Sequence, residues 1–188
     1  MSAFLAPVAT FAIAAGYLSA ASAAPITCGS EQRTATFDSA EDCETGSGNP
    51  GAGTILAEYP GAAWTNAGEL TSEGTNNFLT VDLTSGSWQS EPIQATWSIA
   101  SSFWATYGEA VFSIHVGNGG GEPDYFAWLV TPGATSGTWS YDQLFGGGGG
   151  LSNAKLWGRG VAVPEPTALT LLGMGLAGLA IARRRRKQ

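Results

Sequence analysis

The chain has 188 residues and a formal net charge of −7 at pH 7, and only 12% of its residues are charged. That length is enough for one domain with a single core. Residues 24–160 hold three strong cations against fourteen acids, a formal charge of −11, whereas five cations follow one another at residues 183–187. Because phosphate groups are bound by cationic patches, the acidic central region excludes a nucleic-acid-binding function and disfavours attraction to anionic lipid.

The first residues have the pattern of a secretory signal peptide. Residues 4–18 are apolar, and Ala21-Ser22-Ala23 in the small-residue run that follows fits the small-x-small cleavage rule. We therefore expect residues 1–23 to be removed as a signal peptide. No Lys or Arg precedes Arg33, unlike the usual start of such a peptide. A buried N-terminal helix is the alternative.

The two cysteines, Cys28 and Cys43, lie close together near the expected mature N-terminus. Because an exported protein meets an oxidising compartment, we expect them to form a disulfide. The bridge would close a loop of about 15 residues and stabilise the fold by about 3 kcal/mol in the chain-entropy model. With no further Cys or His ligand nearby, we expect no metal site here.

Residues 24–160 have the pattern of an all-β ectodomain. Short runs in which apolar and polar residues alternate are separated by turns rich in Gly, Pro and Asn. The runs predict strands at 78–83, 93–99, 110–116 and 125–130, with shorter candidates at 54–59 and 154–158. Residues 98–107 fit either a short helical turn or another strand. We therefore predict an antiparallel β-sandwich or jelly roll.

Candidate catalytic groups in this region are few. His115 is the only histidine, and no Gly-x-Ser-x-Gly nucleophile motif accompanies it, so we expect a hydrogen-bonded structural histidine. With fourteen acids, chance carboxylate pairs do not predict a glycosidase. Glu122 and Asp124 follow a glycine run but lack the spacing of a calcium loop, which favours a solvated hairpin turn. We expect no enzyme activity, no cofactor and no metal.

Seven tryptophans are the strongest indication of binding. An indole suits stacking on a sugar ring when exposed and core filling when buried. Trp97 and Trp128 lie within predicted strands, so we expect them in the core. Trp88, Trp104 and Trp139 adjoin stretches rich in Gly, Ser and Thr and could be exposed. Exposure of two or three on one surface would favour a carbohydrate-binding module.

Residues 161–188 form a tail with three parts. Val163-Pro164-Glu165-Pro166 is followed by an uncharged Leu/Gly/Ala-rich run at 167–182, and then by Arg183, Arg184, Arg185, Arg186 and Lys187. The sixteen-residue run would make about 24 Å of helix, short of the ~30 Å hydrocarbon core. The cations that follow are held on the cytoplasmic side. The tail is therefore expected to be an address or a membrane anchor, with an ordinary single-pass anchor as the alternative.

This three-part tail resembles the PEP-CTERM sorting signal of Gram-negative bacteria, a tail also labelled the C-terminal domain of ice-binding proteins. The resemblance implies sorting, not ice binding. It implies that an exosortase, an integral-membrane protease, recognises Pro164-Glu165-Pro166 and removes the tail after transient anchoring in the inner membrane. Residues 147–158 resemble the Gly-Gly-Leu-Ser-His segment that often ends the ectodomain of such proteins, with Asn153 in place of the His.

Together these patterns predict an exported protein of the cell surface or extracellular matrix. We expect a structural or adhesive role linked to exopolysaccharide, with polysaccharide as a possible partner. A carbohydrate-binding module is the alternative, and a secreted hydrolase is the third interpretation.

Overall fold

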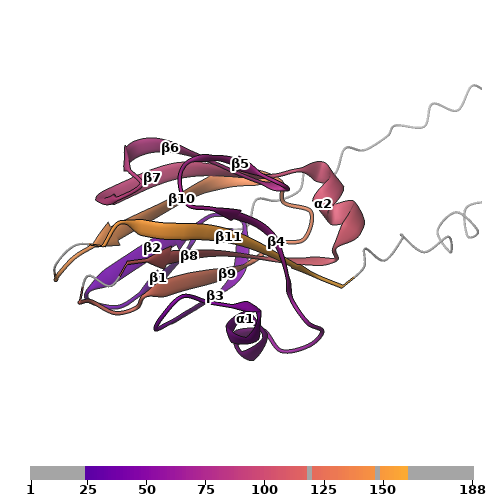
Figure 1. Cartoon of the computed structure of the whole chain (residues 1–188), viewed down its shortest axis with the longest axis horizontal. Coiled ribbons are helices and arrows are strands. Elements are labelled where there is room, and N and C mark those ends of the chain that lie inside the picture. Colours follow the sequence, from indigo (N-terminus) through magenta and orange to yellow (C-terminus); the bar gives the residue numbers. More distant parts are fainter. Residues whose placement is uncertain (1–23, 118–119, 147–148, 161–188) are drawn as a thin grey trace, which may run out of the picture.

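Two antiparallel β-sheets pack face to face and enclose an aromatic core (Figure 1). The computed structural model describes residues 24–117, 120–146 and 149–160. The predicted antiparallel β-sandwich is therefore confirmed. The predicted signal peptide (1–23) and sorting tail (161–188) lie outside the described residues. Within the three described ranges, no helix is long and apolar enough to cross a bilayer.

The first sheet, called sheet A here, has six strands. Their spatial order is β1 (Ile26–Gly29), β2 (Arg33–Phe37), β10 (Ser136–Gln143), β7 (Ser90–Ile99), β6 (Leu79–Ser87) and β5 (Gly74–Asn76). The second sheet, sheet B, has five strands in the order β3 (Ala40–Gly46), β9 (Tyr125–Val130), β8 (Glu109–Val116), β11 (Leu151–Arg159) and β4 (Thr65–Leu70). The chain thus crosses between the sheets several times.

Alternation along the strands builds the core between the sheets. In β7, the apolar side chains at 93, 95, 97 and 99 are buried, whereas Gln94, Thr96 and Ser98 face outward. Phe37 lies at the centre, with its ring stacked on Trp97 of sheet A and on Phe112 and Trp128 of sheet B at centroid distances of 4.8, 5.0 and 5.4 Å. One side chain therefore ties the two layers together.

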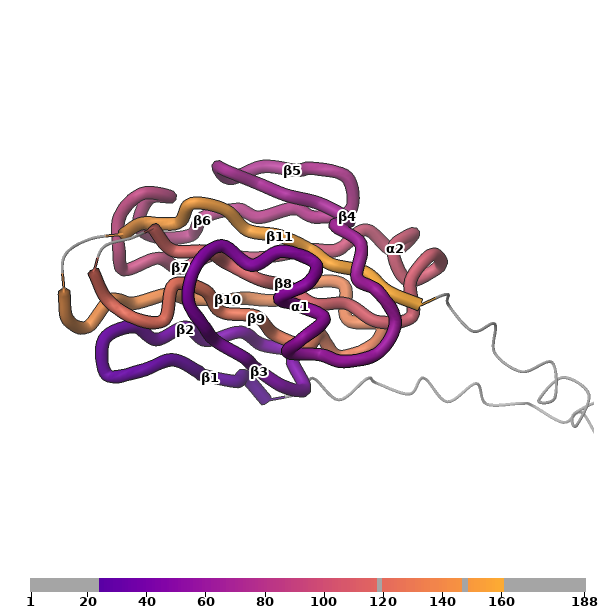
Figure 2. The backbone as a smooth tube through the Cα atoms, turned by 60° about the horizontal axis from the view of Figure 1, so that its bottom comes forward, coloured from indigo at the N-terminus to yellow at the C-terminus, as the bar shows by residue number. Residues whose placement is uncertain are grey.

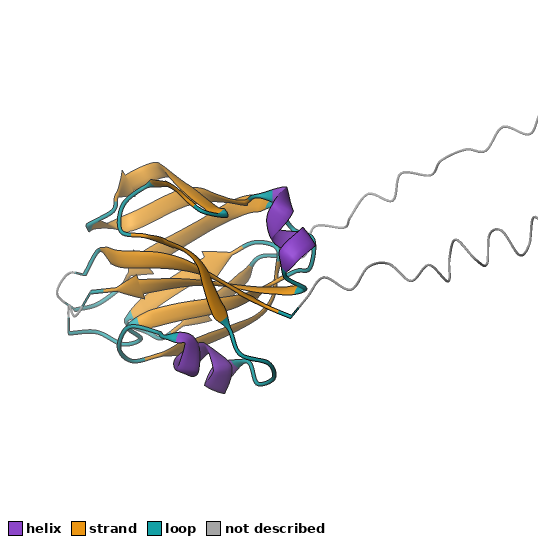
Figure 3. Cartoon of the chain, turned by 45° about the vertical axis from the view of Figure 1, so that its right-hand side comes forward, coloured by secondary structure: helices purple, strands orange, loops and turns teal. Residues whose placement is uncertain are grey.

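The segment at 54–59, a candidate strand in the sequence, is a helix instead. Helix α1 (Ala52–Glu58) lies on the outer face of sheet B, where its Ile55 is fully buried in a second apolar cluster with Val111 and Trp157 (Figure 3). A short apolar run is compatible with either a strand or a helix, and here packing onto sheet B favours the helix. The second helix, α2 (Ser101–Thr106), shows that residues 98–107 contain the short helical turn and not the alternative strand.

The two ends of the sandwich differ. Strand β11 begins beside the glycine-rich connections β8–β9 and β10–β11 and runs the length of sheet B to the opposite end (Figure 2). There its last residues lie near α2, and the ring of Tyr107 packs so closely on Gly158 that a Cβ at that position would lie 2.5 Å from it. The sorting tail therefore follows directly from the end of the sandwich that is opposite the glycine-rich loops.

The predicted disulfide is present. Cys28 on β1 of sheet A and Cys43 on β3 of sheet B are bridged, with a Cα–Cα distance of 6.3 Å. The bond therefore links the edge strands of the two sheets.

Removing this bond should destabilise the ectodomain by about 3 kcal/mol, since it closes a short loop in the unfolded chain. Urea unfolding of the Cys28→Ala/Cys43→Ala variant, compared with the oxidised parent, would measure the loss. As a control, non-reducing peptide mapping of the exported protein should find both cysteines in one linked fragment. Complete alkylation of both thiols without prior reduction would contradict the prediction.

Candidate functional site

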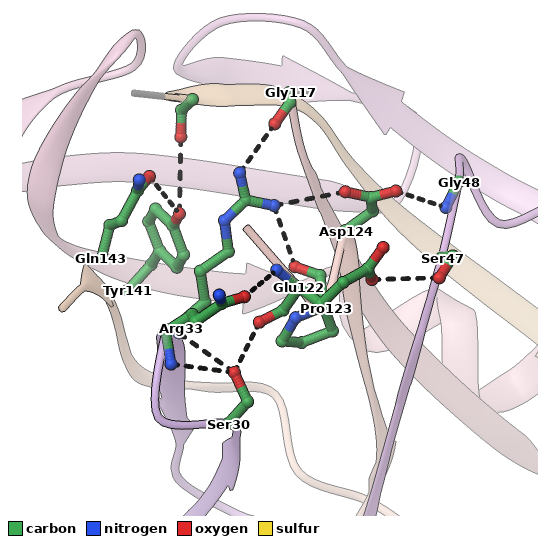
Figure 4. Close-up of polar contacts among 12 residues, drawn as sticks. Ser30, Arg33, Ser47, Gly48, Gly117, Glu122, Pro123, Asp124, Tyr141 and Gln143 are labelled. Carbon is green, nitrogen blue, oxygen red and sulfur yellow. Dashed lines mark hydrogen bonds and ion pairs between the residues drawn. The ribbon is translucent and has the colours of Figure 1, made fainter. Parts of the chain in front are cut away.

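The loops at the glycine-rich end of the sandwich converge on one arginine (Figure 4). Arg33, the first residue of β2, points into the molecule and its side chain is 0% exposed. Its Nη1 donates to the carbonyl of Pro123 at 3.1 Å and to Asp124 Oδ1 at 3.3 Å, and its Nη2 donates to the carbonyl of Gly117 at 3.1 Å. A buried guanidinium needs several acceptors of this kind, and the loop backbone supplies two of the three.

Glu122 and Asp124, the two acids that follow the glycine run, belong to this arrangement. Asp124 Oδ2 accepts a hydrogen bond from the backbone N–H of Gly48 at 2.8 Å, and Glu122 Oε2 accepts one from the Ser47 hydroxyl at 3.0 Å. Their carboxylates thus hold the loop after β3 against the β8–β9 loop, rather than forming a merely solvated turn. In the described part of the chain, no three His, Cys, Asp or Glu side chains are grouped as metal ligands.

His115 is half-buried on β8, and its cross-strand partner on β11 is Asn153. The hydrogen bond expected of a structural histidine is missing at its buried Nδ1, and the buried Asn153 Oδ1 likewise has no partner among the described residues. Burial lowers the pKa of the His115 imidazole below 6.5, although the nearby Asp124 acts in the opposite direction. The nearby Ser113 hydroxyl accepts a hydrogen bond from Trp157 Nε1 at 2.9 Å, so it is held by the core.

The tryptophans are mainly core residues. Trp97 and Trp128 are buried as predicted. Trp88 and Trp139, expected as candidates for exposure, are only 8% and 2% exposed, and Trp104 is half-buried with its indole N–H bound to a backbone carbonyl. Trp139 faces inward because it alternates with outward Thr138 and Ser140 on β10. The aromatic patch that would indicate stacking on sugars therefore does not form among the described tryptophans.

The outer face of sheet A is instead covered by hydroxyl and amide side chains. These outward residues are Thr27, Thr34, Thr36, Thr75, Thr80, Thr96, Ser98, Thr138, Ser140 and Gln94, together with Asp82 and Asp142. The alternating pattern at 93–99 predicted the part of this face that Gln94, Thr96 and Ser98 form. Sequence reasoning missed the face as a whole, because β2 and β10 were not predicted as strands.

Four of these residues form a line across the sheet, called the polar row here. Thr27 on β1 is paired with Thr36 on β2, Thr36 with Ser140 on β10, and Ser140 with Gln94 on β7. Cross-strand partners in an antiparallel sheet share a face, so the four side chains stand side by side. A shallow hollow of about 280 Å³ lies over the middle of the row. Its polar lining is Thr36, Ser140 and Gln94, together with Asp38, Thr84 and Thr138, and its apolar lining is Pro25, Ala95 and Trp139.

All three cations of the described ectodomain are engaged in ion pairs. Arg33 lies 3.3 Å from Asp124, Lys155 lies 3.6 Å from Glu69, and Arg159 lies 2.6 Å from Glu109. The cationic side chains are themselves at most 10% exposed. The solvent-facing charge of the described surface is therefore dominated by carboxylates.

Comparisons with known proteins identify the tail. No curated protein and no solved structure is significantly similar to this chain. The family model of the PEP-CTERM protein-sorting motif matches residues 162–187, as the sequence predicts. A tail of this kind is recognised by an exosortase, which is a membrane protein. The chain therefore carries a PEP-CTERM tail, which marks it as an exported protein that is processed at the membrane before its release to the surface.

Proposed function

We propose that the chain is a non-enzymatic structural or adhesive protein of an exopolysaccharide matrix at the cell surface. The observation that carries this proposal is the PEP-CTERM tail at residues 162–187, joined to a disulfide-bridged β-sandwich. The β-sandwich is the ectodomain that remains outside the cell, and the tail directs its sorting. A disulfide between edge strands suits a protein that must persist in an oxidising environment.

The ectodomain chemistry supports a non-catalytic role. Glu122 and Asp124, which follow the glycine run, are bound to Ser47, Gly48 and Arg33. A carbohydrate-binding module that works by aromatic stacking has weaker support, because the tryptophans fill the core.

The sorting step is tested by two variants that change different parts of the tail. Glu165→Gln alters the recognition motif and keeps the apolar run with its cations, so the protein should stay uncleaved in the inner membrane. Neutralising Arg183 to Arg186 removes the cationic stop, so an uncleaved protein should appear in the medium. Fractionation with an ectodomain epitope and intact-mass analysis would measure both, with the wild-type product lacking residues 1–23 and the tail.

The matrix role is tested by deleting polysaccharide synthesis in the host. The processed wild-type protein should remain with the matrix of normal cells and move to the medium of cells that make none. If it stays on cells without the polysaccharide, the matrix role is contradicted. For the sorting test, cleavage and release of the Glu165→Gln variant as in wild type would show that the exosortase does not recognise the tail through Pro164-Glu165-Pro166.

A further inference from the structure

We propose that the outer face of sheet A is a binding site for a neutral, hydroxyl-rich polysaccharide, held along the polar row by hydrogen bonds rather than by aromatic stacking. This inference rests on the proposed matrix function. It adds the surface that contacts the polymer and the chemical class of that polymer.

The spacing of the polar row suits an extended polymer. Neighbouring strands lie about 4.8 Å apart, so a chain lying across the strands meets a new polar side chain at each step of about that length. Thr27, Thr36, Ser140 and Gln94 occupy four successive strands in register, and Ser85 on β6 is the next partner of Gln94. The row therefore offers hydrogen-bonding groups over the width of the sheet.

Groups in the middle of this row are free to bind a ligand. Among the described residues, no side-chain or backbone group forms a hydrogen bond with the Gln94 amide or the Ser140 hydroxyl, whereas the hydroxyls of Thr27 and Thr36 lie 2.7 Å apart. An amide offers both donors and an acceptor, and a hydroxyl offers one donor and two lone pairs, which matches the mixed chemistry of sugar hydroxyls. The hollow beside them, about 280 Å³, is near the lower end of small-ligand sites.

The charge of the face selects against acidic polymers. The carboxylates of Asp38, Asp82 and Asp142 lie on or beside it. The three cations of the described ectodomain are paired elsewhere, Arg33 inside the loop cluster and the other two on β11 of sheet B. The carboxylates of this face would repel an anionic polysaccharide, whereas they would not repel a neutral one.

Among the described residues, no helix covers this face. Helix α1 covers the outer face of sheet B, and α2 lies at the end of the sandwich (Figure 3). Asp38 is held at the edge of the hollow, where its Oδ1 accepts from Trp97 Nε1 at 3.1 Å and its Oδ2 from the Thr138 backbone N–H at 2.7 Å. The wall of the hollow is therefore fixed before a ligand arrives.

The test uses the full chain in detergent, with Arg183 to Lys187 changed to Gln in every protein so that the tail cations cannot bind alginate. Hydroxyethylcellulose and dextran are the neutral probes, and alginate is the anionic one. We expect retardation in gels that contain at least one neutral polymer and none in alginate. The variant Thr36→Val/Ser140→Ala/Gln94→Leu removes three hydrogen-bonding groups with little change in shape at Thr36. It should weaken the neutral-polymer affinity about tenfold or more. The matched control, Thr75→Val/Thr80→Val/Ser98→Ala, changes the same face away from the hollow and should bind like wild type.

Three results would overturn the inference. The first is a polar-row variant that binds the neutral polymers as tightly as wild type and has an unchanged unfolding midpoint. The second is a wild-type protein that binds neither neutral polymer. The third is a wild-type protein that binds alginate more strongly than the neutral polymers. None of them affects the matrix role, which is judged separately by retention on normal cells and on cells without polysaccharide. Absence from the matrix of normal cells, or retention on cells without polysaccharide, together with intact binding to the neutral probe would instead overturn the proposed function.

Discussion

Replacing Arg33 with methionine should lower the free energy of unfolding by about 3–5 kcal/mol, the usual cost of removing one partner from a buried ion pair. Methionine fills much of the same volume but donates no hydrogen bond. The carbonyls of Gly117 and Pro123 and the carboxylate of Asp124 would then lose their donor inside the loop cluster. The unfolding free energy falls by about 1–3 kcal/mol for each molar of urea, so the urea midpoint should fall by about 1 M or more.

The control for this variant is Arg33→Lys, which keeps the positive charge but loses the planar fork. One ammonium cannot reproduce the directed contacts to Gly117 on one side and to Pro123 and Asp124 on the other. We therefore expect a stability between those of wild type and the methionine variant. Equal stability of all three proteins would show that the loop cluster does not depend on this side chain.

Replacing Phe37 with alanine should destabilise the sandwich by about 3–5 kcal/mol, as for other buried aromatic side chains cut back to alanine. The ring is fully buried and stacks on Trp97, Phe112 and Trp128, which belong to both sheets. Its removal leaves a cavity between the layers that these rigid partners cannot close. Thermal and urea unfolding, each followed by tryptophan fluorescence, would measure the loss.

The same substitution at Phe145 provides the matched control. Phe145 lies in the β10–β11 loop and is 69% exposed. Its change to alanine should alter the stability by no more than about 0.5 kcal/mol. A comparable loss at both positions would mean that the assay reports a general effect of losing phenylalanine, not the packing of the two sheets.

The sequence predicted the strands whose inward positions carry several apolar residues in succession. Strands β6, β7, β8 and β9 follow from this pattern and give the fold class, whereas the disulfide was predicted correctly from export and from the closeness of the two cysteines. Strands β2 and β10 were missed, because β2 reads Arg-Thr-Ala-Thr-Phe and the inward Trp139 of β10 stands among Ser, Thr and Gly. The same omission made Trp139 look exposed when it lies in the core.

The candidate site depended on information that no local pattern contains. The polar row exists because Thr36 of β2 is paired with Ser140 of β10, two strands from opposite ends of the ectodomain. Likewise, nothing near Arg33 in the sequence indicated that it would be buried, since its acceptors Gly117, Pro123 and Asp124 are distant along the chain. Both features follow from strand order and register, which long-range packing decides.

The position of β11 has a mechanical consequence. This strand is paired along its length with β8 on one side and over residues 154–158 with β4 on the other. It leads directly into residue 160, from which the tail continues. A force applied through the tail would act along the axis of β11. Two ladders of hydrogen bonds would therefore be loaded in shear together, instead of being opened one bond at a time from an edge. We expect the ectodomain to stay folded under tension from this end, which single-molecule pulling at residue 160 would measure.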